Sequence, residues 1–399
     1  MEQLKLEQVD IGYGGQPLIQ KIDLSFLQGK MTCILGSNGA GKTTLLKTIA
    51  RIIKPLGGVI RFGGEDVRQI NGVRYAKEVS AVLTDRISLE NCTVWDVAAM
   101  GRNPHTGFFG LLAEEDRRRV RESLEACDAW ELRNRLFNQL SDGQKQKVLI
   151  ARGLCQSTPV LLLDEPTSHL DIFYKIEVLQ TLRTQCVQEG KTVICTLHEP
   201  DLAVKCCDRL VLVKGDRILA CGDTGDIVQS SAIEELYGFS GRQFDPVMGL
   251  VEFPAAKGED VFFAGADENT VYLFRELNRR QKGFAAGVLH QNDLLFALGR
   301  AMGVSMVTQK PYLPVTPEQS EQAFSQAMDY GLIVAADLPE GDFQAENRAL
   351  VRKLAAAGKK VVSTSEYRAL LESKTPIGKE LPDEQGRSGI AVRRDCRRT

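Results

Sequence analysis

The chain has 399 residues, more than a single hydrophobic core usually organises, so we expect two domains. Its apolar content of 43% and charged content of 26% are typical of a soluble globular protein. A net charge of −2 gives no electrostatic reason to expect a nucleic-acid partner. No apolar run approaches the roughly 20 residues that a membrane span needs, and the first residues contain no apolar segment typical of a secretory signal.

A glycine-rich loop lies between the apolar run 30–35 and the helical pattern 43–53. Residues 36–43 fit the G-x-x-x-x-G-K-[ST] motif, whose glycines let successive N–H groups converge on an anion while the helix N-terminus adds its dipole. We expect Lys42 to reach the β- and γ-phosphates of ATP, and Thr43 to place its hydroxyl on Mg²⁺. A glycine turn before a core helix is the alternative interpretation. The predicted nucleotide-binding residues of this loop are Gly36, Ser37, Asn38, Gly39, Ala40, Gly41, Lys42, Thr43 and Thr44.

A second helix N-terminus is predicted in the stretch 138–154, where the helical pattern begins at about Gln144. Ser141 and Gly143 precede that helix, so a further set of N–H groups would face outward. One chain has no need of two phosphate cradles for one nucleotide. Two copies arranged head to tail would use both, which predicts an isologous homodimer with Ser141, Gly143 and Gln144 as further nucleotide-binding residues.

Two adjacent carboxylates follow the apolar strand 160–163. Asp164 and Glu165 would therefore lie at the carboxyl end of a strand, where ligands of open parallel sheets bind. Packing does not explain two acids at this place, although two solvated loop acids are the alternative. We expect Asp164 to bind Mg²⁺, either directly or through a water molecule on the ion, and Glu165 to polarise the attacking water as a general base.

Ten cysteines occur without any C-x-x-C pair. Cys33 and Cys195 lie in apolar, strand-like runs, and Cys206 and Cys207 are adjacent. This placement favours reduced thiols that act as small apolar residues over a disulfide framework.

The composition changes after about residue 245. Five apolar runs, at 261–266, 283–289, 303–309, 331–337 and from 359, alternate with helical stretches, which predicts a small parallel α/β sheet. The predicted strand ends carry Asp267, Asp337 and the sequence His290-Gln-Asn-Asp293, without a dinucleotide fingerprint. His290 could equally belong to a helix cap. The residues from 376 onward are polar, and we expect them to be disordered.

The phosphate loop, the second helix N-terminus, the Asp-Glu pair and the later stretch 192–203 together resemble the nucleotide-binding subunits of ABC transporters over about residues 3–240. The resemblance implies an α/β P-loop NTPase cassette at 1–245, with a mixed sheet and a helical subdomain at about 85–155. A smaller Rossmann-like parallel α/β domain would follow at 246–375, and a disordered tail at 376–399.

The resemblance also implies roles for single residues. His198 matches the switch histidine that contacts the γ-phosphate, and Tyr13 matches the aromatic residue that stacks on adenine, although a turn tyrosine is the alternative for Tyr13. Residues 168–171 match the loop that contacts the opposite subunit. Where the family has a glutamine that joins the metal, this chain offers Thr84 beside Asp85. The signature carries Asp142 in place of a glycine, and we expect this carboxylate to point away from the γ-phosphate.

The stretch 93–110 resembles the importer ATPases that serve iron-siderophore, haem and cobalamin permeases. Its aromatic and aliphatic residues suggest a docking site for a helix from another protein, against the alternative of a generic subdomain loop. The implied protein is a peripheral ATPase on the cytoplasmic face of the membrane. It would bind ATP and Mg²⁺, dimerise around two ATP molecules, drive transmembrane permease subunits and act indirectly with a periplasmic or lipoprotein substrate-binding protein. A soluble ABC-type ATPase that acts on nucleic acid or ribosomes is the alternative function.

Overall fold

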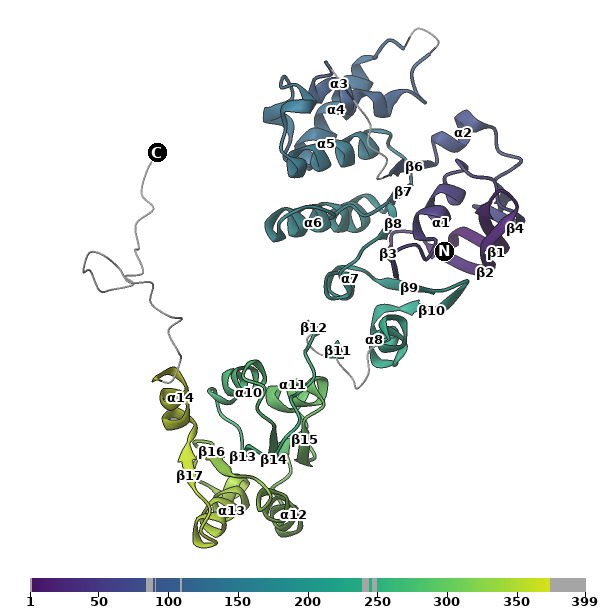
Figure 1. Cartoon of the computed structure of the whole chain (residues 1–399). Helices are drawn as coiled ribbons and strands as arrows, with labels where there is room; N and C mark the ends of the chain where they lie inside the picture. The colour runs from purple at the N-terminus through teal and green to yellow at the C-terminus, as the bar shows by residue number, and fades with distance from the viewer. Residues whose placement is uncertain are drawn as a thin grey trace, which may run out of the picture. The chain divides into compact units, whose positions relative to one another are not determined.

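A computed structural model describes residues 2–83, 89, 91–107, 110–238, 244–245 and 250–373. The chain divides into two compact units, Met1–Phe253 and Pro254–Thr399 (Figure 1). Thr84, Asp85 and the tail from 376 lie outside the described residues, as do Phe108 and Phe109. No helix within the described ranges combines the length and the apolar character that a membrane crossing requires.

A six-stranded mixed sheet forms the centre of the first unit. Its strand order is β10-β9-β3-β8-β7-β6, in which β10 pairs antiparallel with β9 and the other neighbouring strands pair in parallel. This arrangement confirms the predicted mixed sheet. The strands are β3 (Met31–Gly36), β6 (Val79–Val82), β7 (Val160–Leu163), β8 (Thr192–Thr196), β9 (Arg209–Lys214) and β10 (Arg217–Asp223).

A second, antiparallel sheet has the strand order β2-β1-β4-β5. Its strands are β1 (Glu2–Tyr13), β2 (Gln16–Leu27), β4 (Gly57–Phe62) and β5 (Glu65–Asp66). Successive side chains of a strand point to opposite faces, so β3 contributes to two cores. Ile34 packs with residues of the antiparallel sheet and α1, whereas Cys33 and Leu35 pack with residues of the helical layer.

Helices cover the mixed sheet and build a helical subdomain from α3, α4 and α5. The 18-residue helix α6 has Asp171 as its N-cap, whose side chain accepts a hydrogen bond from the N–H of Tyr174, and Gly190 as its C-cap, with a positive φ of 63°. The helices of the first unit are α1 (Lys42–Ile49), α2 (Gly72–Ala76), α3 (Val94–Ala99), α4 (Glu114–Ala126), α5 (Asp142–Cys155), α6 (Ile172–Glu189), α7 (Pro200–Cys206), α8 (Thr224–Gln229) and α9 (Ala232–Tyr237), with single 3-10 turns at Met100–Arg102, Trp130–Leu132 and Phe137–Gln139.

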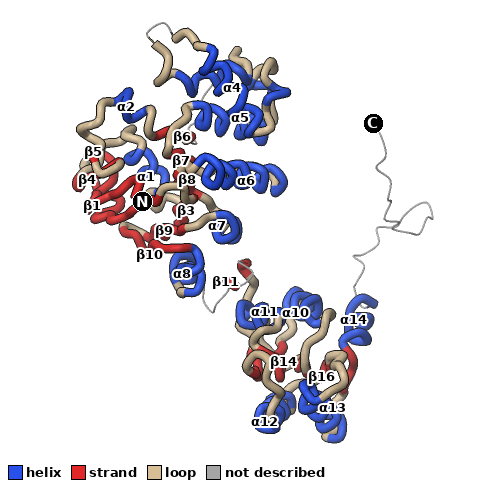
Figure 2. The backbone as a smooth tube through the Cα atoms, turned by 180° about the vertical axis from the view of Figure 1, so that it is seen from behind, coloured by secondary structure: helices blue, strands red, loops and turns tan. Residues whose placement is uncertain are grey.

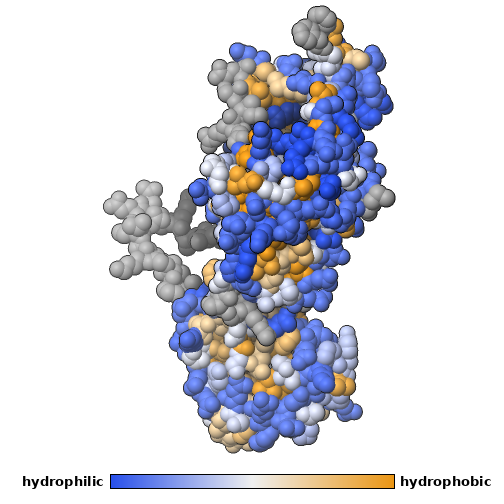
Figure 3. Space-filling model, turned by 90° about the vertical axis from the view of Figure 1, so that its right-hand side faces the viewer, coloured by the Kyte–Doolittle hydropathy of each residue, from blue (hydrophilic) through white to orange (hydrophobic). Residues whose placement is uncertain are grey.

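One buried ion pair fixes the helical subdomain. Arg102 Nε lies 2.8 Å from Asp116 Oδ1, and its guanidinium also donates to the carbonyl of Cys155 at 2.8 Å, which joins α4 and α5. Trp95 is partly buried, with its ring edge-on against Trp130 at 6.1 Å between centroids. Its ring is therefore committed to internal packing, which reduces the exposed apolar area that the sequence suggested here. On the face of the first unit drawn in Figure 3, hydrophilic residues predominate and hydrophobic ones form small groups.

The second unit contains a five-stranded sheet of order β15-β14-β13-β16-β17, in which all strands run parallel. This confirms the predicted parallel α/β domain. Helices α10, α11 and α14 pack on one face, and α12 and α13 on the other (Figure 2). The elements are β13 (Val261–Ala264), α10 (Thr270–Arg279), β14 (Phe284–His290), α11 (Leu294–Met302), β15 (Ser305–Gln309), α12 (Pro317–Ala327), β16 (Leu332–Ala335), α13 (Ala345–Ala356), β17 (Val361–Ser363) and α14 (Thr364–Ser373), with a 3-10 turn at Asp342–Gln344. Two short strands, β11 (Phe244–Asp245) and β12 (Leu250–Val251), pair antiparallel before this unit.

Candidate functional site

The loop between β3 and α1 has the geometry of an anion cradle. Gly39 and Gly41 have φ of 79° and 97°, a region in which residues with a Cβ are strained. A Cβ on Gly36 would lie 2.6 Å from the carbonyl oxygen of Val213, so a side chain there would collide with backbone. These glycines therefore permit the curled backbone of the loop, which leaves the N-terminus of α1 available to an anion.

Lys42 is 5% exposed and holds the loop in shape. Its ammonium donates to the carbonyl oxygens of Gly36 at 2.8 Å and Ser37 at 3.0 Å. Burial lowers the pKa of Lys42, while the carboxylates of Glu165 and Asp164 act in the opposite direction. The ammonium is thus positioned inside the cradle with hydrogen-bonding partners that a phosphate group could replace.

Thr43 and Asp164 join the loop to the end of β7. The hydroxyl of Thr43 donates to Asp164 Oδ2 at 2.8 Å, and the hydroxyl of Thr196 donates to Asp164 Oδ1 at 2.9 Å. Thr196 also accepts a hydrogen bond from the N–H of Glu165 at 2.8 Å. A hydroxyl and a carboxylate in direct contact form a pair of oxygen ligands of the kind that Mg²⁺ prefers.

Glu165 lies where β7, β8 and the following loop converge. His198 Nε2 is 2.6 Å from Glu165 Oε1, and the hydroxyl of Ser168 donates to Glu165 Oε2 at 2.9 Å. Burial raises the pKa of Glu165, but the hydrogen bonds from Ser168 and His198, together with the Lys42 charge, outweigh it and hold the pKa below its ordinary value. Glu165 is therefore an ionised carboxylate near neutral pH and able to accept a proton.

A cavity of about 440 Å³ gathers these side chains. Tyr13 lies at one wall, 56% exposed, and its hydroxyl accepts a hydrogen bond from Thr44 at 3.2 Å. A large aromatic face at the mouth of the cavity suits stacking on a planar ring. The lining residues are Tyr13, Leu18, Asn38, Gly39, Gly41, Lys42, Thr43, Thr44, Glu165 and His198.

The stretch around Ser141 is a helix N-terminus, but its residues are not among those that line the cavity. The helix begins at Asp142, two residues earlier than expected, so Gly143 belongs to its first turn. Ser141 is the N-cap and accepts from the N–H of Gln144 at 3.3 Å, while the Gln144 side chain accepts from the N–H of Ser141 at 3.2 Å. The Asp142 side chain is 78% exposed and lies 3.5 Å from Lys145. Within one chain this second N-terminus therefore has no part in the cavity.

Two residues contribute hydrogen bonds to the site in a way that the sequence does not predict. Thr196 ties Asp164 to Glu165, and Ser168, which was expected to face a second subunit, donates to Glu165. Thr196 could have been noticed in the sequence as a polar residue that follows the apolar run Val193–Cys195 at the carboxyl end of β8. Ser168 gave none, because its contact depends on the positive φ of Glu165, 48°, which turns the chain at that point. Thr84, predicted as a metal ligand, lies outside the described residues.

Polar residues at the strand ends of the second unit bind one another. The Asp267 carboxylate accepts from Asn269 N–H, Thr270 Oγ1, Asp337 N–H and Thr364 Oγ1. His290 is buried, contacts the Leu313 carbonyl through Nε2 at 3.0 Å and stacks on Phe343 at 4.4 Å. Asp293, rather than His290, is the N-cap residue of α11.

Known protein families and sequence relatives match both parts of the chain. The sequence model of the ABC transporter family matches residues 19–168, and that of the MJ0874 family matches residues 284–388. An uncharacterised ABC transporter ATP-binding protein of Methanocaldococcus jannaschii is 39% identical over 249 residues, which cover 62% of this chain and 86% of that protein. The iron(3+)-hydroxamate import ATP-binding protein of Bacillus subtilis is 31% identical, covering 59% of this chain and 88% of that protein.

Solved structures agree with the sequence relatives. A transporter described as of the metal-chelate type, in an inward-facing conformation, is 27% identical with a TM-score of 0.53, covering 60% of this chain and 90% of that chain. CbiO1 of Clostridium perfringens, part of an ABC transporter complex, is 26% identical with a TM-score of 0.51. The match covers 59% of this chain and 94% of that chain. Cavity, loop and relatives lead to one conclusion: this chain belongs to the ATP-binding proteins of ABC transporters and is an ATP-binding ATPase.

Proposed function

We propose that this protein is the ATP-hydrolysing subunit of an ABC importer, and that its catalytic site is the cavity between the phosphate loop and the carboxyl ends of β7 and β8. The observation that carries the proposal is the contact of Glu165 with His198 at 2.6 Å, directly beside Lys42 and Thr43 in one cavity. A general base, a phosphate-binding cation and a metal-binding hydroxyl are the parts that phosphoryl transfer to water needs.

The phosphates of ATP would lie against the N–H groups of residues 36–44 and the N-terminus of α1. Lys42 would exchange its two carbonyl partners for phosphate oxygens, which costs little because the ammonium is already positioned. Tyr13 would stack on the adenine ring. Thr43 and Asp164 would hold Mg²⁺, the ion that screens the phosphate charge; Thr84 remains a third proposed ligand.

Glu165 would accept the proton of the attacking water. Its low pKa keeps the carboxylate ionised, and Ser168 fixes one of its oxygens so that the other faces His198 and the cavity. His198 would give its hydrogen bond to the γ-phosphate once nucleotide is bound, which releases Oε1 of Glu165 to bind the water. The hydrolytic step would therefore be sensitive to the geometry at the ends of β7 and β8.

A second copy of the chain would complete the site. Ser141, Gly143 and Gln144 lie at the N-terminus of a 14-residue helix and do not line the cavity of their own chain. In a head-to-tail homodimer they would reach the γ-phosphate bound by the other copy. The exposed Asp142 side chain pairs with Lys145, an arrangement that would keep its charge from the phosphate.

The transported substrate class is proposed from the relatives. Besides the hydroxamate importer, the cobalamin import ATP-binding protein of Halobacterium salinarum is 29% identical over 314 residues, covering 76% of this chain and 78% of that protein. We therefore propose that the dimer drives permease subunits for iron-siderophore, haem or cobalamin from the cytoplasmic face of the membrane, with a substrate-binding protein delivering the substrate.

Reconstitution of transport tests this proposal. The full chain would be purified with the polytopic membrane protein that co-purifies from its own cells, reconstituted in proteoliposomes, and supplied with ATP and a labelled ferric siderophore, haem or cobalamin. We expect ATP-dependent uptake of one of them, lost in Glu165→Gln. ATPase activity that responds to ribosomes or nucleic acid, without any membrane partner, would instead support the alternative function.

A further inference from the structure

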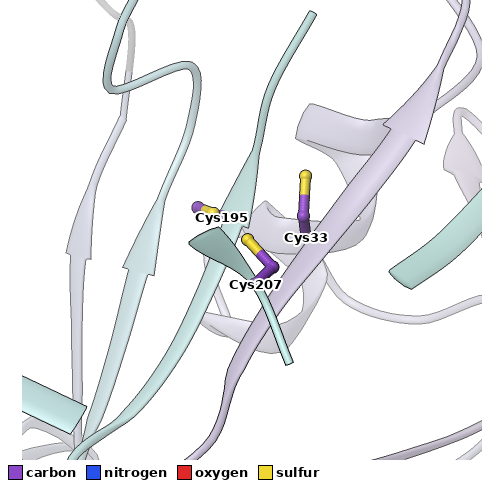
Figure 4. A group of neighbouring side chains, drawn as sticks. All are labelled: Cys33, Cys195 and Cys207. Carbon is purple, nitrogen blue, oxygen red and sulfur yellow. The ribbon is translucent and has the colours of Figure 1, made fainter. Parts of the chain in front are cut away.

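Three buried thiols meet in the core of the first unit. Cys33 lies on β3, Cys195 on β8, and Cys207 directly follows α7 (Figure 4). Their sulfur atoms all lie within 4.8 Å of one another, and the three residues are 0%, 0% and 7% exposed. The three positions come from distant parts of the sequence, and the parallel pairing of β3 with β8 sets Cys33 opposite Cys195 in register.

We propose that Cys33, Cys195 and Cys207, the thiol triad, form a binding site for a soft monovalent metal ion, copper(I). Thiolates select soft ions, of which copper(I), zinc and iron–sulfur clusters are the common cases. Metal–sulfur bonds of about 2.3 Å require sulfur atoms about 4 Å apart around a single ion. The spacing of the triad therefore suits one ion without a rearrangement of the sheet.

The number of donors favours copper(I) over zinc. Zinc in a structural site takes four ligands, whereas the group found among the described residues has three. Cys206 Sγ is 3.5 Å from Cys207 Sγ, but Cys206 is not part of the group in which every sulfur lies within 4.8 Å of the others. A soft ion that accepts two or three sulfur ligands fits this arrangement.

The site is stable when it is empty. Without an ion, the three cysteines pack as small apolar groups in the hydrophobic core of the first unit. A bound copper(I) ion would displace at least two thiol protons to the solvent, leaving sulfur–metal bonds in place of S–H bonds.

The position of the triad gives the ion a structural consequence. Cys33 lies three residues before Gly36, where the phosphate loop begins, and Cys195 lies three residues before His198. One ion bound to both strands would therefore tie together the two strands that carry the cradle and the switch histidine. Ligand binding to the native state raises its stability by mass action, so loading should raise the melting temperature.

Competitive titration tests the proposal. The full, reduced protein would be titrated anaerobically with copper(I) held by a chromophoric chelator. We expect one equivalent to transfer, a higher melting temperature on loading, and at least a tenfold loss of affinity in Cys33→Val and in Cys195→Val. The matched controls are Cys155→Ala, a buried thiol outside the triad, and Cys206→Ala, both of which should keep full affinity.

Two further measurements keep the test independent of folding defects. ATP affinity should be unchanged in every variant used, and X-ray absorption at the copper edge should show two or three sulfur neighbours and no nitrogen or oxygen. Copper that binds equally well to Cys33→Val would overturn the proposal, as would loss of binding in Cys206→Ala or tighter binding of zinc than of copper(I). A disulfide instead of a copper adduct in the intact mass would also overturn it.

Discussion

Each of the two units has polar residues at the carboxyl ends of parallel strands, and these residues have different roles in the two units. In the first unit, the ends of β3, β7 and β8 direct Lys42, Glu165 and His198 toward one cavity. In the second unit, the Asp267 carboxylate after β13 accepts hydrogen bonds from Asp337 N–H and Thr364 Oγ1, which links it to the segments that follow β16 and β17. A polar residue at a strand end can therefore serve either a binding cavity or a structural contact, and its hydrogen-bond partners determine which.

The largest expected effect concerns Glu165. Replacing it by glutamine removes the proton acceptor while preserving size, and general-base help is typically worth about 10²–10⁴ in rate. We expect Glu165→Gln to bind ATP yet hydrolyse it slower by that factor, and to accumulate as an ATP-stabilised dimer in size-exclusion chromatography. Asp337→Asn is the matched control, since it neutralises an exposed acid at a strand end of the second unit. Near wild-type turnover in Glu165→Gln would remove the residue from this role.

Lys42→Ala should give the next largest effect. The substitution removes an ammonium that already binds two loop carbonyls, and a hydrogen bond to a charged group contributes about 1.5–3 kcal/mol. ATP affinity, measured by calorimetry, should fall about tenfold to a hundredfold. The apo protein should still fold, with a lower melting temperature because the two hydrogen bonds to the loop carbonyls are lost. Lys310→Ala, an exposed lysine after β15, serves as control and should leave affinity unchanged. Unchanged affinity in Lys42→Ala would contradict the phosphate-cradle interpretation.

For Asp267→Ala we expect a loss of stability without a loss of ATPase activity. Its carboxylate accepts four hydrogen bonds from three separate segments, so its loss should lower the free energy of unfolding of the second unit by about 2–3 kcal/mol. ATPase activity should stay at the wild-type level. Hydrogen exchange read by mass spectrometry would localise the destabilisation to residues 254–373. A loss of ATPase activity that accompanies a fully folded first unit would show that the comparison between the units is wrong.

A smaller effect is expected for Ser168→Ala, and it appears in the pH profile. The hydrogen bond from Ser168 helps to hold the pKa of Glu165 below its ordinary value, so the carboxylate stays ionised to lower pH. Without it the pKa rises, and Glu165 becomes protonated, and therefore inactive as a base, at higher pH. The acidic limb of kcat/KM should move to higher pH with little change at pH 8. An unshifted limb would mean that another group controls it.

The predictability of the molecule from its sequence also differs between the two units. The phosphate loop could be predicted because Gly36 to Thr43 are local in sequence and their residue types are dictated by backbone geometry. The Ser168–Glu165 contact could not be predicted, because it depends on the positive φ of Glu165, which no sequence pattern indicates. The parallel sheet of the second unit was predictable from its apolar runs, yet the four-way role of Asp267 was not, since its partners lie 2 to 97 residues away. Residue types in the sequence therefore indicate where a polar residue lies at a strand end, but the role of that residue depends on partners that are distant in the sequence.

The smallest effect should follow from removing the second unit altogether. The first unit contains every residue that lines the cavity, and the chain divides after Phe253. A truncated chain of residues 1–253 should therefore keep its magnesium-dependent ATPase within a factor of about three, because no transition-state contact is lost. Sedimentation velocity with ATP would measure dimer affinity in parallel with turnover. A truncated chain that is folded and binds ATP, but does not hydrolyse it, would show that the second unit supplies part of the hydrolytic machinery.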